Sequence, residues 1–281
     1  MILKLRDRRI DVTHRTAVMG ILNVSDDSPV AFSRVGLEQA LDRAHALAAE
    51  GAEIIDIGAH STATGAKDLA PSEEIERVAP VIEAVVRAGL IASVDTWTPA
   101  VARAAAEAGV HLLNDVTGFV EPGMVEVARE FGLPGCIMHM RGDPKRHREV
   151  SQQYEDIEAE VRTDLVRRAQ TLKAQGVDVW LDPGFGFGRS ASDNAELLRG
   201  LPALVAEGYP VLVSASRKGF LAELMGQPYG QDQDGLLEAT VAFNSLAAYW
   251  GAHVVRVHDV AEVSDAVKIA SAIRSGLANV R

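Results

Sequence analysis

Short apolar runs recur along the chain, and each one stops abruptly at a polar or charged residue. The eight runs end at Asn23, Asp56, Asp95, Asn114 and Asp115, His139, Asp182, Lys218, and Arg256 and His258. Apolar runs of this length without alternation are typical of strands buried on both faces, as in a parallel sheet. The carboxyl ends of such strands are where an α/β barrel holds its chemistry.

The segments between these runs are amphipathic, and most of them end at a glycine, for example Gly51, Gly89 and Gly132. A glycine just past a helix supplies the left-handed backbone conformation that stops the helix. Thr98 and Pro99 form a start signal, a hydroxyl cap followed by proline at the first helical position. Strand, helix and glycine repeated eight times predict a (β/α)8 (TIM) barrel. The competing interpretation is a doubly wound open sheet, which rarely needs eight units with polar strand ends.

The length of 281 residues suits one barrel, so residues 1–281 are expected to form a single domain. The first 17 residues resemble a short hairpin that covers the lower mouth of the barrel. We expect no membrane-spanning segment and no signal peptide. The single cysteine, Cys136, lies inside an apolar run and is expected to be a small buried residue. These features predict a cytoplasmic protein.

The formal net charge of −11 argues against nucleic acid or an anionic membrane as a partner. A cationic group stands out against this background at the ends of the last two runs, and Arg141 is a candidate fifth member. Its members are Arg217, Lys218, Arg256 and His258. Barrels commonly hold phosphate at this position, so the group predicts an anionic small ligand. The alternative is that these residues pair with acidic neighbours such as Asp182 or Asp259.

Two carboxylates and an amide are expected to converge on one ligand, since Asp95, Asn114 and Asp182 end three different runs. Such a set suits a flat heterocycle with several N–H donors and a carbonyl, and an aminopyrimidinone edge has these groups in a row. Lys218 is placed to donate to the ring carbonyl. The alternative for each carboxylate alone is that it caps a loop.

Eight short motifs at the predicted strand ends, in order, resemble those of the dihydropteroate synthase family over nearly the whole chain. They are MGILNV around Asn23, IIDIGAHST at 54–62, SVDT around Asp95, NDVTG at 114–118, MHMRG at 138–142, LDPGFGFGR at 181–189, SRKGF at 216–220 and RVHDV at 256–260. Methyl-tetrahydrofolate methyltransferases share the pterin-binding barrel, but the SRK and RVHD motifs favour the synthase branch.

The resemblance implies condensation of 6-hydroxymethyl-7,8-dihydropterin diphosphate with 4-aminobenzoate, a step of folate biosynthesis that releases diphosphate. The implied pterin-binding residues are Asp95, Asn114, Asp182 and Lys218, with Phe187 near the pocket wall or in the core. The implied diphosphate-binding residues are Asn23, Thr62, Arg256 and His258. Mg2+ would bridge the phosphate oxygens with Asn23 as its protein ligand. Ser216, Arg217 and Gly219 would lie on the amine side, and Lys218, Arg256 and His258 would act in catalysis.

Three departures from the family pattern fall on the parts that close over the amine and diphosphate. Within residues 23–35, Asp26 replaces the family's proline, Pro29 replaces its phenylalanine, and the Asp-Gly-Gly end is gone. HSTATG at 60–65 lacks the family's arginine and proline. Gly219 stands where the family has serine. Four alternative functions therefore remain: a weakened synthase, a diverged pterin-dependent transferase, a non-catalytic pterin-binding protein and a methyltransferase. His60 is a candidate general base, although a lone loop histidine is more often without such a role.

The segment 235–252 has a wide apolar surface for an outer barrel helix. Its large apolar residues are Val241, Phe243, Leu246, Tyr249 and Trp250. Family members are dimers through this region, so the resemblance implies a homodimer. The alternative is that these residues pack on the barrel.

Overall fold

Eight parallel strands form the centre of the computed structural model, which describes residues 1–24, 37–59, 69–144, 146–227 and 233–276. The strands are β3 (Ala17–Asn23), β4 (Ile54–Gly58), β5 (Ala92–Asp95), β6 (Leu112–Asp115), β7 (Gly135–Met138), β8 (Val179–Asp182), β9 (Leu212–Ser214) and β10 (Val254–Val257). They are hydrogen-bonded in the order β8-β7-β6-β5-β4-β3-β10-β9. A parallel bridge between Leu181 and Val211 joins β8 to β9 and closes the ring. The predicted (β/α)8 barrel is confirmed.

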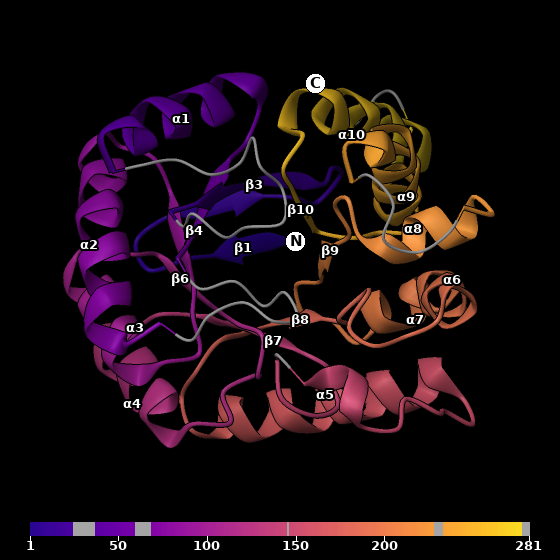
Figure 1. Ribbon diagram of the computed structural model, residues 1–281, viewed down its shortest axis with the longest axis horizontal. Coiled ribbons are helices and arrows are strands. Elements are labelled where there is room, and N and C mark those ends of the chain that lie inside the picture. Colours follow the sequence, from indigo (N-terminus) through magenta and orange to yellow (C-terminus); the bar gives the residue numbers. More distant parts are fainter. Residues whose placement is uncertain (25–36, 60–68, 145, 228–232, 277–281) are drawn as a thin grey trace.

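Helices surround this ring on all sides (Figure 1). They are α1 (Leu37–Glu50), α2 (Pro71–Arg87), α3 (Pro99–Glu107), α4 (Pro122–Phe131), α5 (Ile157–Ala174), α6 (Ala191–Arg199), α7 (Leu201–Ala206), α8 (Gly219–Leu224), α9 (Leu237–Tyr249) and α10 (Val260–Ser275), with short 3-10 turns η2 (His147–Glu149) and η3 (Gln233–Leu236). In the described part of the chain, none of the helices combines the length and apolar character needed to cross a bilayer.

The predicted helix signals are mostly present. Gly132 caps α4 with φ of 65°, a left-handed conformation that ordinary residues avoid. Pro99 is the first residue of α3, as the sequence predicts. The hydroxyl of Thr98 makes no capping hydrogen bond, so that part of the start signal is wrong. The Thr98 amide instead donates to the hydroxyl of Thr96, 3.2 Å away.

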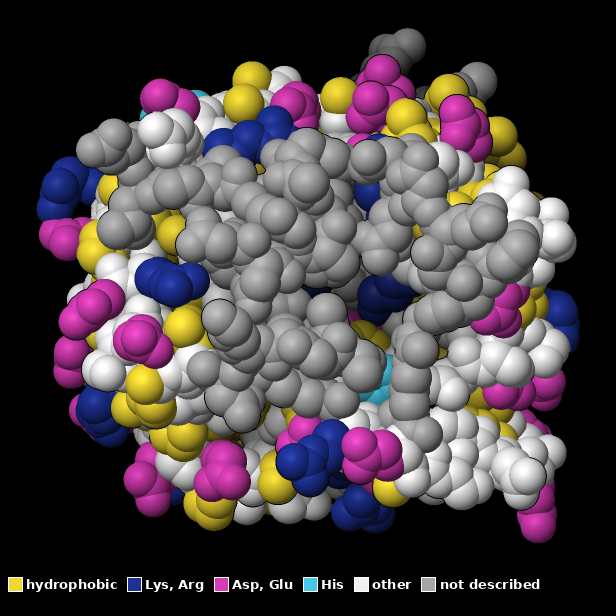
Figure 2. Space-filling view, viewed as in Figure 1, with side chains coloured by type: hydrophobic (Ala, Val, Ile, Leu, Met, Phe, Trp, Pro, Cys, Tyr) yellow, Lys and Arg dark blue, Asp and Glu magenta, His cyan; other side chains and the backbone are white. Residues whose placement is uncertain are grey.

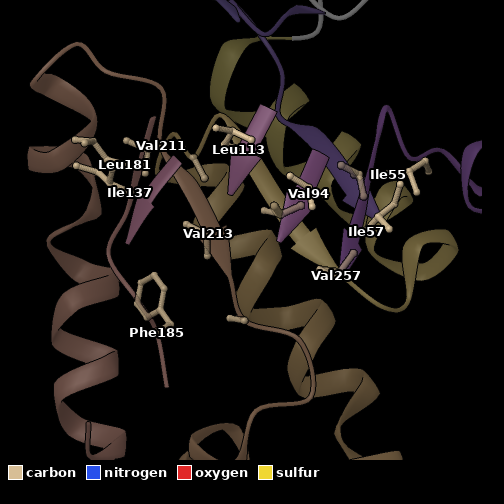
Figure 3. Close-up of a cluster of buried hydrophobic side chains, with 14 of the residues drawn as sticks. Ile55, Ile57, Val94, Leu113, Ile137, Leu181, Phe185, Val211, Val213 and Val257 are labelled. Carbon is tan, nitrogen blue, oxygen red and sulfur yellow. The ribbon is translucent and has the colours of Figure 1, made fainter. Parts of the chain in front are cut away.

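An outer core lies between the strands and the helices (Figure 3). Alternate strand residues point toward it, such as Ile55 and Ile57 of β4 and Val94 of β5. Because the side-chain period of a strand is two, the residues between them point into the barrel. Asp56, between Ile55 and Ile57, therefore lies on the inner face of β4.

A second apolar cluster fills the lower half of the barrel interior. The antiparallel hairpin of β1 (Ile2–Lys4) and β2 (Arg9–Asp11) supplies Leu3 and Ile10 to it. These pack against inward residues of the strands, among them Trp180 and Cys136, which is fully buried and unpaired. The hairpin therefore closes the lower mouth, as predicted, and leaves the opposite end for polar side chains.

Candidate active site

An arginine at the carboxyl end of β10 joins two aspartates inside the barrel mouth. Arg256 Nε donates to Asp56 Oδ2 at 2.5 Å, and Arg256 Nη2 donates to Asp95 Oδ2 at 2.6 Å. Asn114 Nδ2 donates to the same Asp56 oxygen at 3.2 Å. The side chain of Asp56 is fully buried, while those of Asp95 and Arg256 are 14% and 15% exposed. Four strands, β4, β5, β6 and β10, thus each contribute one polar side chain to a single hydrogen-bonded cluster.

A lysine and a third aspartate extend this cluster on the side of β8 and β9. Lys218 Nζ donates to the carbonyl oxygen of Phe185 at 2.6 Å and lies 4.6 Å from the centre of the Phe187 ring. Asp182 Oδ1 accepts from the Gly184 amide at 2.7 Å, which fixes the carboxylate at the start of the loop. Phe187 therefore lines the site beside Lys218, and the core position is taken by Phe185, which is fully buried.

Burial sets the protonation of this cluster. It raises the pKa of Asp95 to about 7, with Arg256 opposing the shift and the nearby Asp56 carboxylate adding to it. It lowers the pKa of Lys218 to about 8, although Asp182 pulls in the other direction. Burial also raises the pKa of Asp182. Arg256 is buried as well, but its pKa is raised because Asp56 and Asp95 outweigh the cost of desolvation. The guanidinium is therefore a permanent cation between two carboxylates.

His258 lies beside this cluster and is neutral. Its backbone amide donates to Ser216 Oγ at 3.1 Å, so the ends of β9 and β10 are tied together. Burial and the positive charge of Arg256 lower its pKa to about 3. Asn23 ends β3 at the same end of the barrel. In the view of Figure 2, Lys, Arg and His side chains are visible near the centre of the face.

Two of the predicted cations do not join Arg256. Arg217 Nε and Nη2 donate to Asp259 at 2.8 and 2.7 Å, which is the acidic pairing that the sequence left as an alternative. Arg141 pairs with Glu160 at 2.7 Å and stacks over the ring of Tyr154 at 3.9 Å. The cationic group facing the cluster therefore consists of Lys218 and Arg256, with a neutral His258. Gly219 is the first residue of α8, so its backbone amide lies at a helix start.

A buried arginine fixes the loop that follows β8. Arg189 Nη1 donates to the carbonyl oxygen of Pro183 at 2.6 Å, and it also donates to that of Gly184. Arg189 Nη2 contacts His139 Nδ1 at 2.6 Å. Burial and this guanidinium lower the pKa of His139 to about 4, so the imidazole is neutral and accepts the hydrogen bond. These contacts fix the position of the loop after β8, whose Phe185 carbonyl oxygen accepts a hydrogen bond from Lys218.

The structure brings together Asp95, Asn114, Asp182, Lys218 and Arg256 as the sequence predicts. His60 and Thr62 lie outside the described residues, as do residues 25–35 of the first altered loop and the whole of the second, 60–65. The prediction omitted Asp56 from the ligand set, although its run ends at a carboxylate like the others. The signal was present, but only the structure shows that Asp56 faces inward and pairs with Arg256.

The fold and this cluster define a barrel protein whose mouth suits a flat heterocycle rich in N–H donors, next to an anionic group. A family model described as pterin binding enzyme matches residues 19–258. The chain belongs to the dihydropteroate synthase family of pterin-binding enzymes.

Relatives with this activity in their names match along almost their whole length. Dihydropteroate synthase of Escherichia coli K12 is 39% identical over 97% of this chain and 96% of its own. That of Mycobacterium leprae is 39% identical over 91% and 92%. A Yersinia pestis dihydropteroate synthase solved with a sulfonamide drug has a TM-score of 0.91 and 39% identity, over 98% of this chain and all of its own. The Thermus thermophilus enzyme in complex with 4-aminobenzoate has a TM-score of 0.86 and 39% identity, over 97% of this chain and all of its own.

Proposed function

We propose that this protein condenses 6-hydroxymethyl-7,8-dihydropterin diphosphate with 4-aminobenzoate, forming dihydropteroate and releasing diphosphate. The observation that supports this most is the buried cluster of Asp95, Asn114, Asp182 and Lys218 around the inner mouth. The carboxylates and the amide accept and donate along the aminopyrimidinone edge, and Lys218 donates to the ring carbonyl.

The reaction is a substitution at the methylene carbon of the pterin. The amine nitrogen forms the new C–N bond, the C–O bond to diphosphate breaks, and the leaving diphosphate takes the electron pair. The attacking nitrogen then loses a proton. Arg256 offers a positive charge beside the pterin cluster, and the neutral His258 offers a ring nitrogen rather than a second cation. The contribution of the protein is positioning, stabilisation of the leaving group and exclusion of water.

We propose Mg2+ as the cofactor. Among the described residues, no group of three or more His, Cys, Asp or Glu side chains is arranged to hold a metal ion. Magnesium nevertheless binds through few protein oxygens and mainly through substrate phosphates, so the amide oxygen of Asn23 fits this chemistry. When bound, the ion would neutralise the leaving diphosphate. Chelation is expected to abolish turnover and to weaken diphosphate binding measured by calorimetry, and intact diphosphate affinity in EDTA would argue against the metal.

The direct test is incubation with the pterin diphosphate, Mg2+ and 4-aminobenzoate. Formation of both dihydropteroate and diphosphate supports the proposal. Release of diphosphate without dihydropteroate would indicate another acceptor or hydrolysis, and tight pterin binding without turnover would indicate a binding protein. Methyl transfer from methyl-tetrahydrofolate would instead favour the methyltransferase alternative.

We also propose a homodimer through α9 and α10. The sequence prediction for this surface is right only in part, because Phe243 is buried against Phe185 and Phe220. The exposed apolar residues are Leu246 and Tyr249 of α9 with Ile269 and Ile273 of α10, at 46%, 47%, 63% and 67% exposure. An apolar patch shared by two adjacent helices is a common interface with a second copy.

Replacing a patch residue with a charge tests this interface. Ile269→Lys is expected to shift the sedimentation coefficient to that of a monomer. Ile2→Lys is the matched control, since Ile2 is also exposed (53%) but lies on the hairpin. A monomeric wild type would refute the proposal.

We further propose that the protein acts in the cytoplasm, where reducing conditions suit a chain whose one cysteine is buried and unpaired.

A further inference from the structure

Two side chains of α9 form hydrogen bonds with the backbone of the turn that follows β9. Thr240 and Asn244 lie one turn apart on α9, and both are fully buried. Asn244 Nδ2 donates to the Ala215 carbonyl oxygen at 2.9 Å, and Thr240 Oγ1 accepts from the Arg217 amide at 2.9 Å. Buried polar groups are costly unless they are hydrogen-bonded, so these contacts fix the turn on both sides of Ser216.

The same turn is held from the opposite side by α10. Arg217 has φ of 52°, a left-handed conformation that is rare outside glycine. Its guanidinium donates two hydrogen bonds to the Asp259 carboxylate. Asp259 occupies the N-cap position of α10 but makes no side-chain capping bond. An aspartate at this position normally caps the helix, and here its carboxylate is committed to Arg217 instead.

The turn places two site residues on either side of Arg217. Ser216 Oγ accepts from the His258 amide at 3.1 Å, and Lys218 Nζ reaches the Phe185 carbonyl at 2.6 Å. A rotation of the Arg217 backbone out of the left-handed region would move both side chains, because each is joined to that residue by one peptide bond.

We propose that Thr240, Asn244 and Asp259 are positioning residues that hold Arg217 in its left-handed conformation and thereby set Lys218 and Ser216 in the mouth. None of the three belongs to the cluster around Arg256. The inference deepens the proposed function and rests on it for the kinetic readout alone.

The test compares Thr240→Val with Thr240→Ser. Valine keeps the shape but removes the acceptor of the Arg217 amide, and serine keeps the hydroxyl. We expect Thr240→Val to weaken binding of 6-hydroxymethylpterin about tenfold, the loss that one displaced hydrogen bond produces. Thr240→Ser should restore the affinity to within about twofold. Thr171→Val is the control for loss of a threonine hydroxyl far from the turn, because the Thr171 hydroxyl donates to the Arg167 carbonyl within α5.

Steady-state kinetics and amide exchange separate positioning from a general loss of stability. In Thr240→Val, kcat is expected to fall at saturating pterin, and the Arg217 amide is expected to exchange faster than in the wild type. A lowered Tm with unchanged pterin affinity, kcat and exchange would overturn the proposal. If Thr240→Val does not fold, the same pterin-binding measurement is made on Asp259→Asn, which weakens the pairing with Arg217. Wild-type pterin affinity in Asp259→Asn would also overturn the proposal.

Failure of the proposed function would look different. A wild type that forms no dihydropteroate refutes the synthase assignment. The pterin affinities and the exchange of the Arg217 amide still test the positioning, because neither requires turnover.

Discussion

The Asp56 carboxylate adds to the effect of burial in raising the pKa of Asp95, and this contribution can be tested with Asp56→Asn. Both carboxylates accept from one guanidinium, that of Arg256. Two carboxylates on the same guanidinium lie roughly 5 Å apart, and at an effective dielectric constant of about 20 their repulsion is roughly 3 kcal/mol. One pKa unit corresponds to about 1.4 kcal/mol, so removing the charge of Asp56 should lower the pKa of Asp95 by about 2 units.

The assay is the affinity for 6-hydroxymethylpterin as a function of pH, measured by fluorescence between pH 5 and 7.5. Asp95 has a pKa of about 7 and can accept two N–H donors only as a carboxylate, so wild-type affinity should fall as the pH drops below 7. In Asp56→Asn the midpoint of this fall should move to lower pH. The midpoint is the informative quantity, because it does not depend on how much the substitution weakens binding overall.

Asp164→Asn serves as the matched control. Asp164 also pairs with two arginines, Arg167 and Arg168, but on α5. This variant should keep the wild-type midpoint, and the titration of the free ligand is measured separately and subtracted. An unchanged or raised midpoint in Asp56→Asn would refute the electrostatic reasoning.

Three further predictions follow from buried groups and tight contacts. Burial lowers the pKa of four histidines in the fold: that of His111, those of His139 and His253 to about 4, and that of His258 to about 3. The unfolded chain therefore binds more protons below pH 6.5, and each histidine should cost up to about 1.4 kcal/mol of unfolding free energy per pH unit as the pH falls toward 4; urea midpoints that stay flat from pH 6.5 to 5 would contradict this. Gly184→Ala should destabilise by about 1–3 kcal/mol more than Gly208→Ala, because a Cβ at Gly184 would lie 2.1 Å from the His139 carbonyl oxygen, whereas at Gly208 it meets nothing within 4 Å; equal urea-unfolding losses would show that the clash relaxes. Ala63→Arg combined with Gly219→Ser should raise synthase activity if the altered loops limit it, and no gain in kcat/KM would exclude that explanation.

The sequence by itself determined the barrel, because strands buried on both faces and glycine-terminated helices are local signals. All eight apolar runs became strands of the ring, and the polar residues at their ends lie at one mouth. The pterin-side residues Asp95, Asn114 and Asp182 could be named in advance for this reason, since the carboxyl ends of parallel barrel strands lie together.

Only the tertiary structure decided which of these charges face one another. Asp56 lies within β4 and Arg217 lies in the turn after β9, yet Asp56 faces inward to Arg256, whereas Arg217 pairs with Asp259. The pairing depends on strand register and on one left-handed backbone angle at Arg217, and neither is a property of the local sequence. The same holds for Phe243, which belongs to the core rather than the exposed patch because the rotation of α9 is set by packing.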